Sequence, residues 1–176
     1  MKKTLLTMLF LAASLSALEI QHTTVKFTAF KTYAKKGVSG VFDKVKVQSK
    51  QGSDVQALLS NAVADIDTSS VNSGNKGRDI KLVSKFFDVQ NVKNIKAKLS
   101  HIDKSSLIAA ITMNGKTLNI PMSYTVANGT INAKGTIDLA DFDMIPSLKA
   151  INKACYDLHQ GKTWQDVDIY FNIAYK

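Results

Sequence analysis

The sequence predicts an all-β protein with short helices, built as an eight-stranded antiparallel barrel. Apolar and polar residues alternate in segment after segment, which is the period of a strand with one buried and one solvated face. Asn114-Gly115 and Asn128-Gly129 separate consecutive alternating runs and are typical of tight hairpin turns. About eight such strands can form a sandwich or a barrel, and closure removes the exposed edges, so a small barrel fits best.

Each expected strand is defined by its alternating run. The clearest runs cover residues 95–99, 118–126 and 167–175, and each places its apolar side chains on one face. Shorter or bulged runs are expected at residues 25–29, 41–50, 57–66, 107–113 and 130–139.

Two segments have helical spacing instead. From Asp79 to Val89 the apolar positions repeat every three or four residues, with Asp79 placed to cap the first turn. A second amphipathic helix is expected from Ile145 to about His159. These helices could cover the mouths of the barrel. The apolar face of the second helix consists of Leu148, Ile151, Cys155 and Leu158.

The N-terminus reads as a secretory signal peptide. Met1-Lys2-Lys3 is followed by an apolar stretch over residues 5–13 and by Ala17 at the expected cleavage point. This predicts two parts, a signal peptide at residues 1–17 and one β-barrel domain at residues 18–176, in a protein exported to the periplasm or secreted. The apolar stretch is shorter than the roughly 20 residues that span a bilayer, so no stable membrane insertion is expected.

Charge and cysteine content limit the possible binding partners and cross-links of the protein. The formal net charge is +9, spread as single lysines, which favours a solvated basic face over a nucleic-acid partner. Cys155 is the single cysteine, so the fold must rest on packing without an internal disulfide. Monomer and homodimer both stay open, and a homodimer could pair through the helix that carries Cys155.

Catalytic motifs are lacking. The sequence has no phosphate loop, dinucleotide-binding glycine motif or zinc motif, so we expect no enzyme activity, no cofactor and no metal. Asp138, Asp141 and Asp143 lack the spacing of a calcium loop. Two alternatives remain: a small-substrate enzyme that uses His22 or His101 with aspartates, and an interaction module that docks through the helix near residues 145–159.

One signature spans the first helical segment. Asp67-Thr68, then Arg78-Asp79, Leu82 and Phe86-Phe87-Asp88 resemble the pattern of the YceI-like, lipocalin-like family of exported polyisoprenoid-binding proteins. Arg78 is the only arginine among 23 basic residues. The resemblance extends over nearly all of the mature chain, although Lys93-Asn94 replaces the family's usual tyrosine-proline and the late connection at residues 145–159 is enlarged.

The resemblance implies a lipocalin-like barrel with an elongated apolar cavity and a long-chain lipid ligand, such as an isoprenoid quinone, a polyprenyl compound or a fatty amide. Burial stabilises such a tail by roughly 0.8 kcal/mol per methylene. Selectivity for the headgroup would then come from a few polar residues. The polar candidates are Arg78, Asp79, His22 and Tyr124, and the apolar candidates are Phe27, Phe42, Phe86, Phe87, Ile111, Phe142, Trp164, Ile169 and Phe171.

Structural roles stay open for the same residues. The interior could be fully packed with no cavity, and Phe86 and Phe87 could fix the helix to the barrel. Arg78 could tie the helix start to a strand carbonyl or to Asp67, and Trp164 could plug the barrel.

Overall fold

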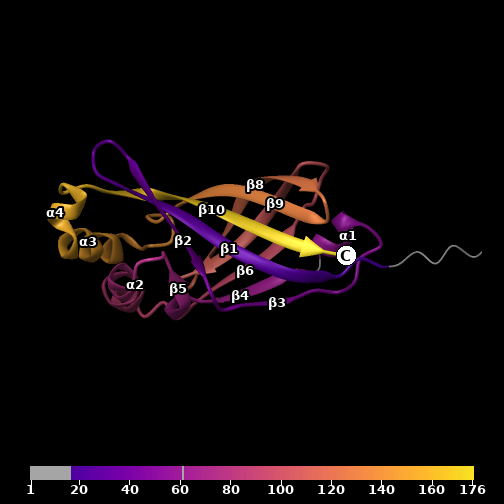
Figure 1. Cartoon of the computed structure of the whole chain (residues 1–176), viewed down its shortest axis with the longest axis horizontal. Coiled ribbons are helices and arrows are strands. Elements are labelled where there is room, and N and C mark those ends of the chain that lie inside the picture. Colours follow the sequence, from indigo (N-terminus) through magenta and orange to yellow (C-terminus); the bar gives the residue numbers. More distant parts are fainter. Residues whose placement is uncertain (1–16, 61) are drawn as a thin grey trace, which may run out of the picture.

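The computed structural model describes residues 17–60 and 62–176, so the signal peptide expected at residues 1–17 lies, apart from Ala17, outside the described residues. One antiparallel sheet curls around an apolar interior (Figure 1). Its strand order is β3-β4-β6-β7-β8-β9-β10-β1-β2-β5. The strands are β1 (Ile20–Lys31), β2 (Lys36–Phe42), β3 (Val45–Gln48), β4 (Val63–Asp67), β5 (Val71–Asn72), β6 (Asn94–Ser100), β7 (Ser106–Met113), β8 (Lys116–Ala127), β9 (Thr130–Asp138) and β10 (Thr163–Tyr175).

The sheet has ten strands where the sequence predicts eight, because two long strands are interrupted. β2 and β3 follow one another directly, broken only at Asp43 and Lys44. β4 and β5 are separated by the 3₁₀ turn η1 (Thr68–Ser70), and they pair with β3 and β2 respectively. The chain between β2 and β3 therefore links the two ends of the curled sheet.

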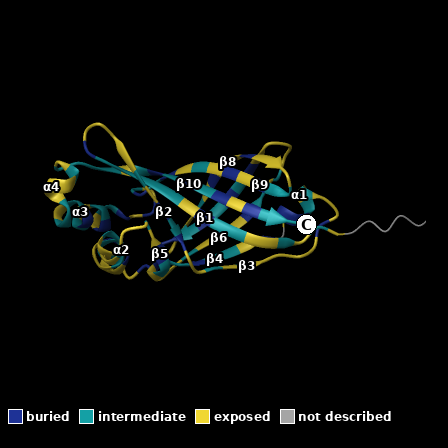
Figure 2. Cartoon of the chain, viewed as in Figure 1, coloured by how far each residue is buried: buried dark blue, intermediate teal, exposed yellow. Residues whose placement is uncertain are grey.

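Alternation and hairpin turns behave as the sequence predicts. Along β7 every second residue is buried. Buried and exposed colours also alternate along the labelled strands β8 and β9 (Figure 2). Asn114, Gly115, Asn128 and Gly129 all have positive φ angles between 49° and 76°, which is the left-handed region that two-residue hairpin turns require.

Helices cover both ends of the sheet. α1 (Val55–Ser60) lies at one end, and Leu58 and Leu59 on it are fully buried. The strand predicted over residues 57–66 is therefore wrong in its first half, because this apolar pair belongs to a helix and β4 begins only at Val63. At the other end lie α2 (Lys76–Leu82), α3 (Ile145–Ala154) and α4 (Tyr156–His159) (Figure 1).

The first predicted helix starts earlier than expected and changes its geometry. It runs through α2, the π-helical segment η2 (Val83–Phe87) and the 3₁₀ turn η3 (Asp88–Gln90). Asn75, not Asp79, is the N-cap, since its side chain accepts a hydrogen bond from the Arg78 amide at 2.9 Å.

The second predicted helix is broken at Cys155, whose φ of −127° and ψ of 25° separate α3 from α4. Ile151 is buried and Leu148 packs against the core, whereas Leu158 is 65% exposed. α3 is tied to η3 by Gln90, whose side-chain oxygen accepts hydrogen bonds from the backbone and hydroxyl of the buried Ser147. The face proposed for docking a partner is therefore mostly used within the molecule.

No helix among the described residues is long and apolar enough to cross a membrane.

Candidate functional site

Four of the aromatic candidates form one packed cluster at the α2–α3 end. The ring centroids of Phe27 and Phe42 lie 5.6 Å apart, those of Phe42 and Phe87 6.1 Å, and those of Phe86 and Phe87 5.0 Å. Phe42, Phe86 and Phe87 are all buried. Adjacent residues of an α-helix point about 100° apart, and the wider π turn of η2 lets both Phe86 and Phe87 reach the core. These contacts fix the helix to the sheet.

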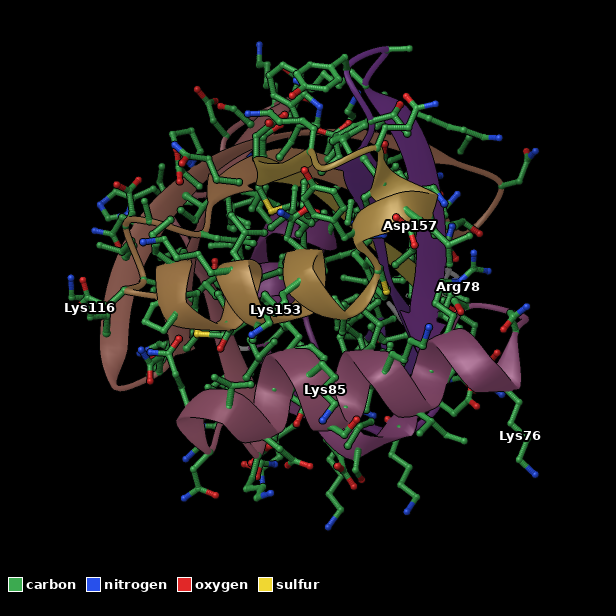
Figure 3. The ribbon with its side chains drawn as sticks, turned by 90° about the vertical axis from the view of Figure 1, so that its left-hand side faces the viewer. Lys76, Arg78, Lys85, Lys116, Lys153 and Asp157 are labelled. Carbon is green, nitrogen blue, oxygen red and sulfur yellow. The ribbon has the colours of Figure 1, made fainter. Side chains whose placement is uncertain are left out.

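Arg78 holds its own helix start. Its Nε donates to Ser73 Oγ at 2.8 Å, and its Nη2 donates to the Ser73 carbonyl at 2.9 Å. The Asp79 carboxylate accepts from the Ser73 amide at 2.9 Å and also from the Ser73 hydroxyl. Both signature residues thus clamp Ser73, which directly follows β5. Figure 3 looks onto this end and shows Arg78 at the side of α2.

Five further predicted site residues are buried in the interior of the sheet. Ile111, Tyr124, Ile169 and Phe171 are buried on their strands, and Phe142 is fully buried just after β9. The Tyr124 hydroxyl donates a hydrogen bond to the Asp103 carbonyl. Burial, and to a lesser extent the charge of Asp103, raises the pKa of Tyr124.

Trp164 lies against the β1–β2 turn. Its indole N–H donates to the Thr32 carbonyl at 2.8 Å, and the ammonium groups of Lys35 and Lys162 lie over its ring.

The histidines of the enzyme alternative lie outside the sheet interior. His22 is exposed and 3.2 Å from the Thr24 hydroxyl, and His101 is exposed beside Ser100. Asp138 accepts hydrogen bonds from the Ala140 amide and from Gln165. No group of three His, Cys, Asp or Glu side chains that could hold a metal ion occurs among the described residues.

A lateral opening, which we call the window, interrupts the wall of the sheet. β1 pairs with β2 only up to Lys26 and Val41, and pairing resumes at an isolated bridge between Leu18 and Gly52. Between these two points residues 19–25 and 42–51 are not paired with each other. The second stretch is longer than the first, so the two cannot pair residue for residue.

The far boundary of the window is held by Gly52. Leu18 and Gly52 exchange two backbone hydrogen bonds of 2.7 and 3.0 Å. A Cβ at position 52 would lie 2.3 Å from the Leu58 amide nitrogen, so only glycine fits between Leu18 and α1. The window is thus a defined part of the fold, with a fixed pairing at each end.

A groove of about 450 Å³ lies over the window, and a small apolar cavity of about 20 Å³ lies beneath it. Ile20, Thr23 and Val47 line both spaces and so form the boundary between them. The groove is lined by Ile20, Gln21, His22, Thr23, Thr24, Val41, Phe42, Asp43, Val45, Val47 and Ser49. The cavity is lined by Ile20, Thr23, Val25, Val47, Ala62, Val63, Ala64, Ala97, Leu99, Phe171 and Ile173.

Thr23 stands out in this boundary. Its hydroxyl oxygen is buried and has no hydrogen-bond partner among the described residues, and such a lack costs roughly 1–3 kcal/mol in a protein interior. This polar atom lies at the junction of the polar groove and the apolar cavity.

Three of the residues predicted from the sequence line the groove or the cavity, namely His22, Phe42 and Phe171, whereas Thr23 and Val47 were not predicted. One signal was present. The apolar residues Phe42, Val45 and Val47 are spaced by three and then by two, which marks a break in the strand at residues 43–44. The pattern does not say which strand would then be left without a partner.

Comparisons with solved structures agree with this fold. BcnA from Burkholderia cenocepacia is 16% identical, with a TM-score of 0.60, over 88% of this chain and 96% of that chain. A polyisoprenoid binding domain from Saccharophagus degradans is 13% identical, with a TM-score of 0.61, over 91% and 97%. A YceI protein from Campylobacter jejuni is 17% identical, with a TM-score of 0.54, over 100% and 99%.

The curled antiparallel sheet around an apolar interior, capped by short helices, defines a lipocalin-type β protein. The model of the YceI-like domain matches residues 17–175, and the chain belongs to this family. This confirms the family predicted from the Arg78 signature. No curated protein sequence matches the chain.

Proposed function

We propose that the protein is a non-catalytic carrier of a long amphiphilic lipid, such as an isoprenoid quinone, a polyprenyl compound or a fatty amide. The tail lies inside the curled sheet. The observation that carries this proposal is an apolar interior reached through a groove in the sheet wall. Membership of a family in which a structural neighbour is described as polyisoprenoid-binding supports it.

The interior must widen to take a tail. A cavity of about 20 Å³ has room for about one water molecule and is far too small for a long tail. Met113, Met122 and Met144 lie in the core, and their unbranched side chains adapt to irregular spaces more readily than branched ones. Ala97 and Ala109 add little volume to the same interior. We therefore expect a tail to displace the methionines.

The proposed carrier works in the periplasm. The charged and apolar N-terminal segment is that of a secretory signal, which would deliver the domain to the periplasm. There a protein that buries the tail can hold a poorly soluble lipid away from water, at roughly 0.8 kcal/mol for each methylene buried.

The proposal is tested by extracting the purified protein with organic solvent for mass spectrometry and by titrating the stripped protein with a prenyl quinone and a fatty amide. We expect a co-purified lipid or saturable binding of at least one probe. In Ala97→Leu the larger side chain fills the cavity and should weaken binding, whereas Ala34→Leu on the exposed β1–β2 turn should not. An empty extract together with no binding by either probe would refute the carrier function.

A further inference from the structure

The window offers two chemically different layers to one ligand. Its outer groove carries hydrogen-bonding side chains, among them Gln21, Thr24 and Ser49, while the cavity beneath is almost entirely aliphatic or aromatic. Val47 and Thr23 line both layers. A molecule that spans them needs a polar head outside and an apolar tail inside.

The charge of the groove limits what that head can be. The chain has a formal net charge of +9, yet neither Arg78 nor any lysine of residues 17–60 and 62–176 lines the groove. The one carboxylate that lines it, Asp43, accepts two hydrogen bonds from Asn72 at 3.0 and 3.2 Å. A phosphate or diphosphate head would meet this carboxylate, and His22 is the one lining side chain among the described residues that can carry a positive charge. The groove therefore lacks the lysine or arginine whose charge-assisted pairing makes phosphate binding strong.

The edges of the window permit lateral entry. Because residues 19–25 and 42–51 are unpaired with each other, a tail can pass between Thr23 and Val47 without breaking strand pairing. Entry along the axis of the sheet is obstructed at one end by the packed phenylalanines and at the other by α1 with its buried leucines.

We propose that the window is the entry and headgroup site for a long-chain lipid with an uncharged, hydrogen-bonding head, such as an alcohol, phenol or amide. The head lies in the groove and the Thr23 hydroxyl bonds to it. The tail passes between Thr23 and Val47 into the interior. This inference rests on the carrier function proposed above and adds the location and the head chemistry.

Two matched pairs of variants test it by titration with a prenyl alcohol and the prenyl monophosphate of the same chain length. Thr23→Val removes only the hydroxyl, and we expect its affinity for the alcohol to fall about five- to tenfold, the size of one hydrogen bond. Thr28→Val makes the same change on β1 outside the window, where Thr28 bonds to Ser39, and should leave affinity unchanged.

Ser49→Lys places a cation in the groove, and Ser84→Lys adds the same charge on the exposed face of η2. We expect Ser49→Lys alone to raise affinity for the monophosphate about tenfold, as a charge-assisted hydrogen bond would. The wild type should prefer the alcohol.

The outcomes separate the two proposals. If neither probe binds the wild type, the carrier function for prenyl lipids fails and this inference fails with it. If both bind equally and all four variants behave as the wild type, the tail is held inside but the window is not the head site. Preference of the wild type for the monophosphate would overturn the head chemistry.

Discussion

The half of the molecule around α2 and α3 is sealed, whereas the half around the window is open. In the sealed half four phenylalanines pack in series and Ser73 is clamped by both Arg78 and Asp79. In the open half two strand segments run past each other without pairing, and the buried Thr23 hydroxyl has no partner in the part of the chain that the structure describes. The recognisable sequence signature belongs to the half that stabilises the fold, whereas the groove and the proposed headgroup site belong to the other.

The largest expected difference between the halves is in stability. Phe87→Ala should lower the free energy of unfolding by about 3–5 kcal/mol, because it leaves a cavity between Phe42 and Phe86. Val47→Ala, at the half-exposed edge of the window, should cost only about 1 kcal/mol. Chemical denaturation of both variants measures this. Equal losses would mean that the open half is packed as firmly as the sealed one.

The second prediction separates stability from binding at the signature. Arg78→Lys loses the fork that donates to both the hydroxyl and the carbonyl of Ser73, and lysine cannot replace it. We expect a loss of about 1–2 kcal/mol in unfolding free energy and no change in affinity for a prenyl alcohol. Reduced affinity at unchanged stability would instead place Arg78 in the binding site and remove the contrast between the halves.

These contrasts also explain what the sequence could predict. Strands and hairpins follow from local alternation and from residues that tolerate positive φ, so β6, β7 and the turns at Asn114 and Asn128 agree with the prediction. Local patterns misassigned Leu58 and Leu59, since two adjacent apolar residues fit a strand or a short buried helix equally well. The signature gave the family, because it reflects the packing of the sealed half.

The window could not be predicted in the same way. It arises from pairing between segments about 25 residues apart, where one stretch is longer than the one it faces. Threonine, serine and valine carry no motif that would mark them as a site. The two-residue break at Asp43 and Lys44 is visible in the sequence, but its consequence depends on how β1 is paired.

The third prediction concerns Thr23. Replacing it with valine should raise the free energy of unfolding by about 1 kcal/mol in the empty protein, because the buried hydroxyl without a partner is removed. Thermal and chemical unfolding of the stripped protein measure the gain. Destabilisation would show that the hydroxyl is satisfied in solution and that the open half holds no unused polar group.

The smallest expected effect is a pH dependence in the sealed half. His159 on α4 accepts or donates a 2.7 Å hydrogen bond with Thr163, and burial, followed by the nearby Lys31 and Lys81, lowers the pKa of its imidazole. The folded protein therefore binds a proton at His159 less readily than the unfolded chain. Its contribution to stability is present above the unfolded pKa of about 6.5 and is lost as the pH falls through the folded value.

Two measurements test this pH dependence. One is the free energy of unfolding between pH 8 and 5.5, and the other is an NMR titration of His159. Stability should decline towards the acidic end, and His159→Gln should reduce the decline. Lys81→Met removes one of the two cations and should move the pKa of His159 back towards its ordinary value while leaving the hydrogen bond to Thr163 in place. A folded pKa at or above the ordinary value would show that the His159 imidazole is not buried in solution, and the sealed half would then end at α3.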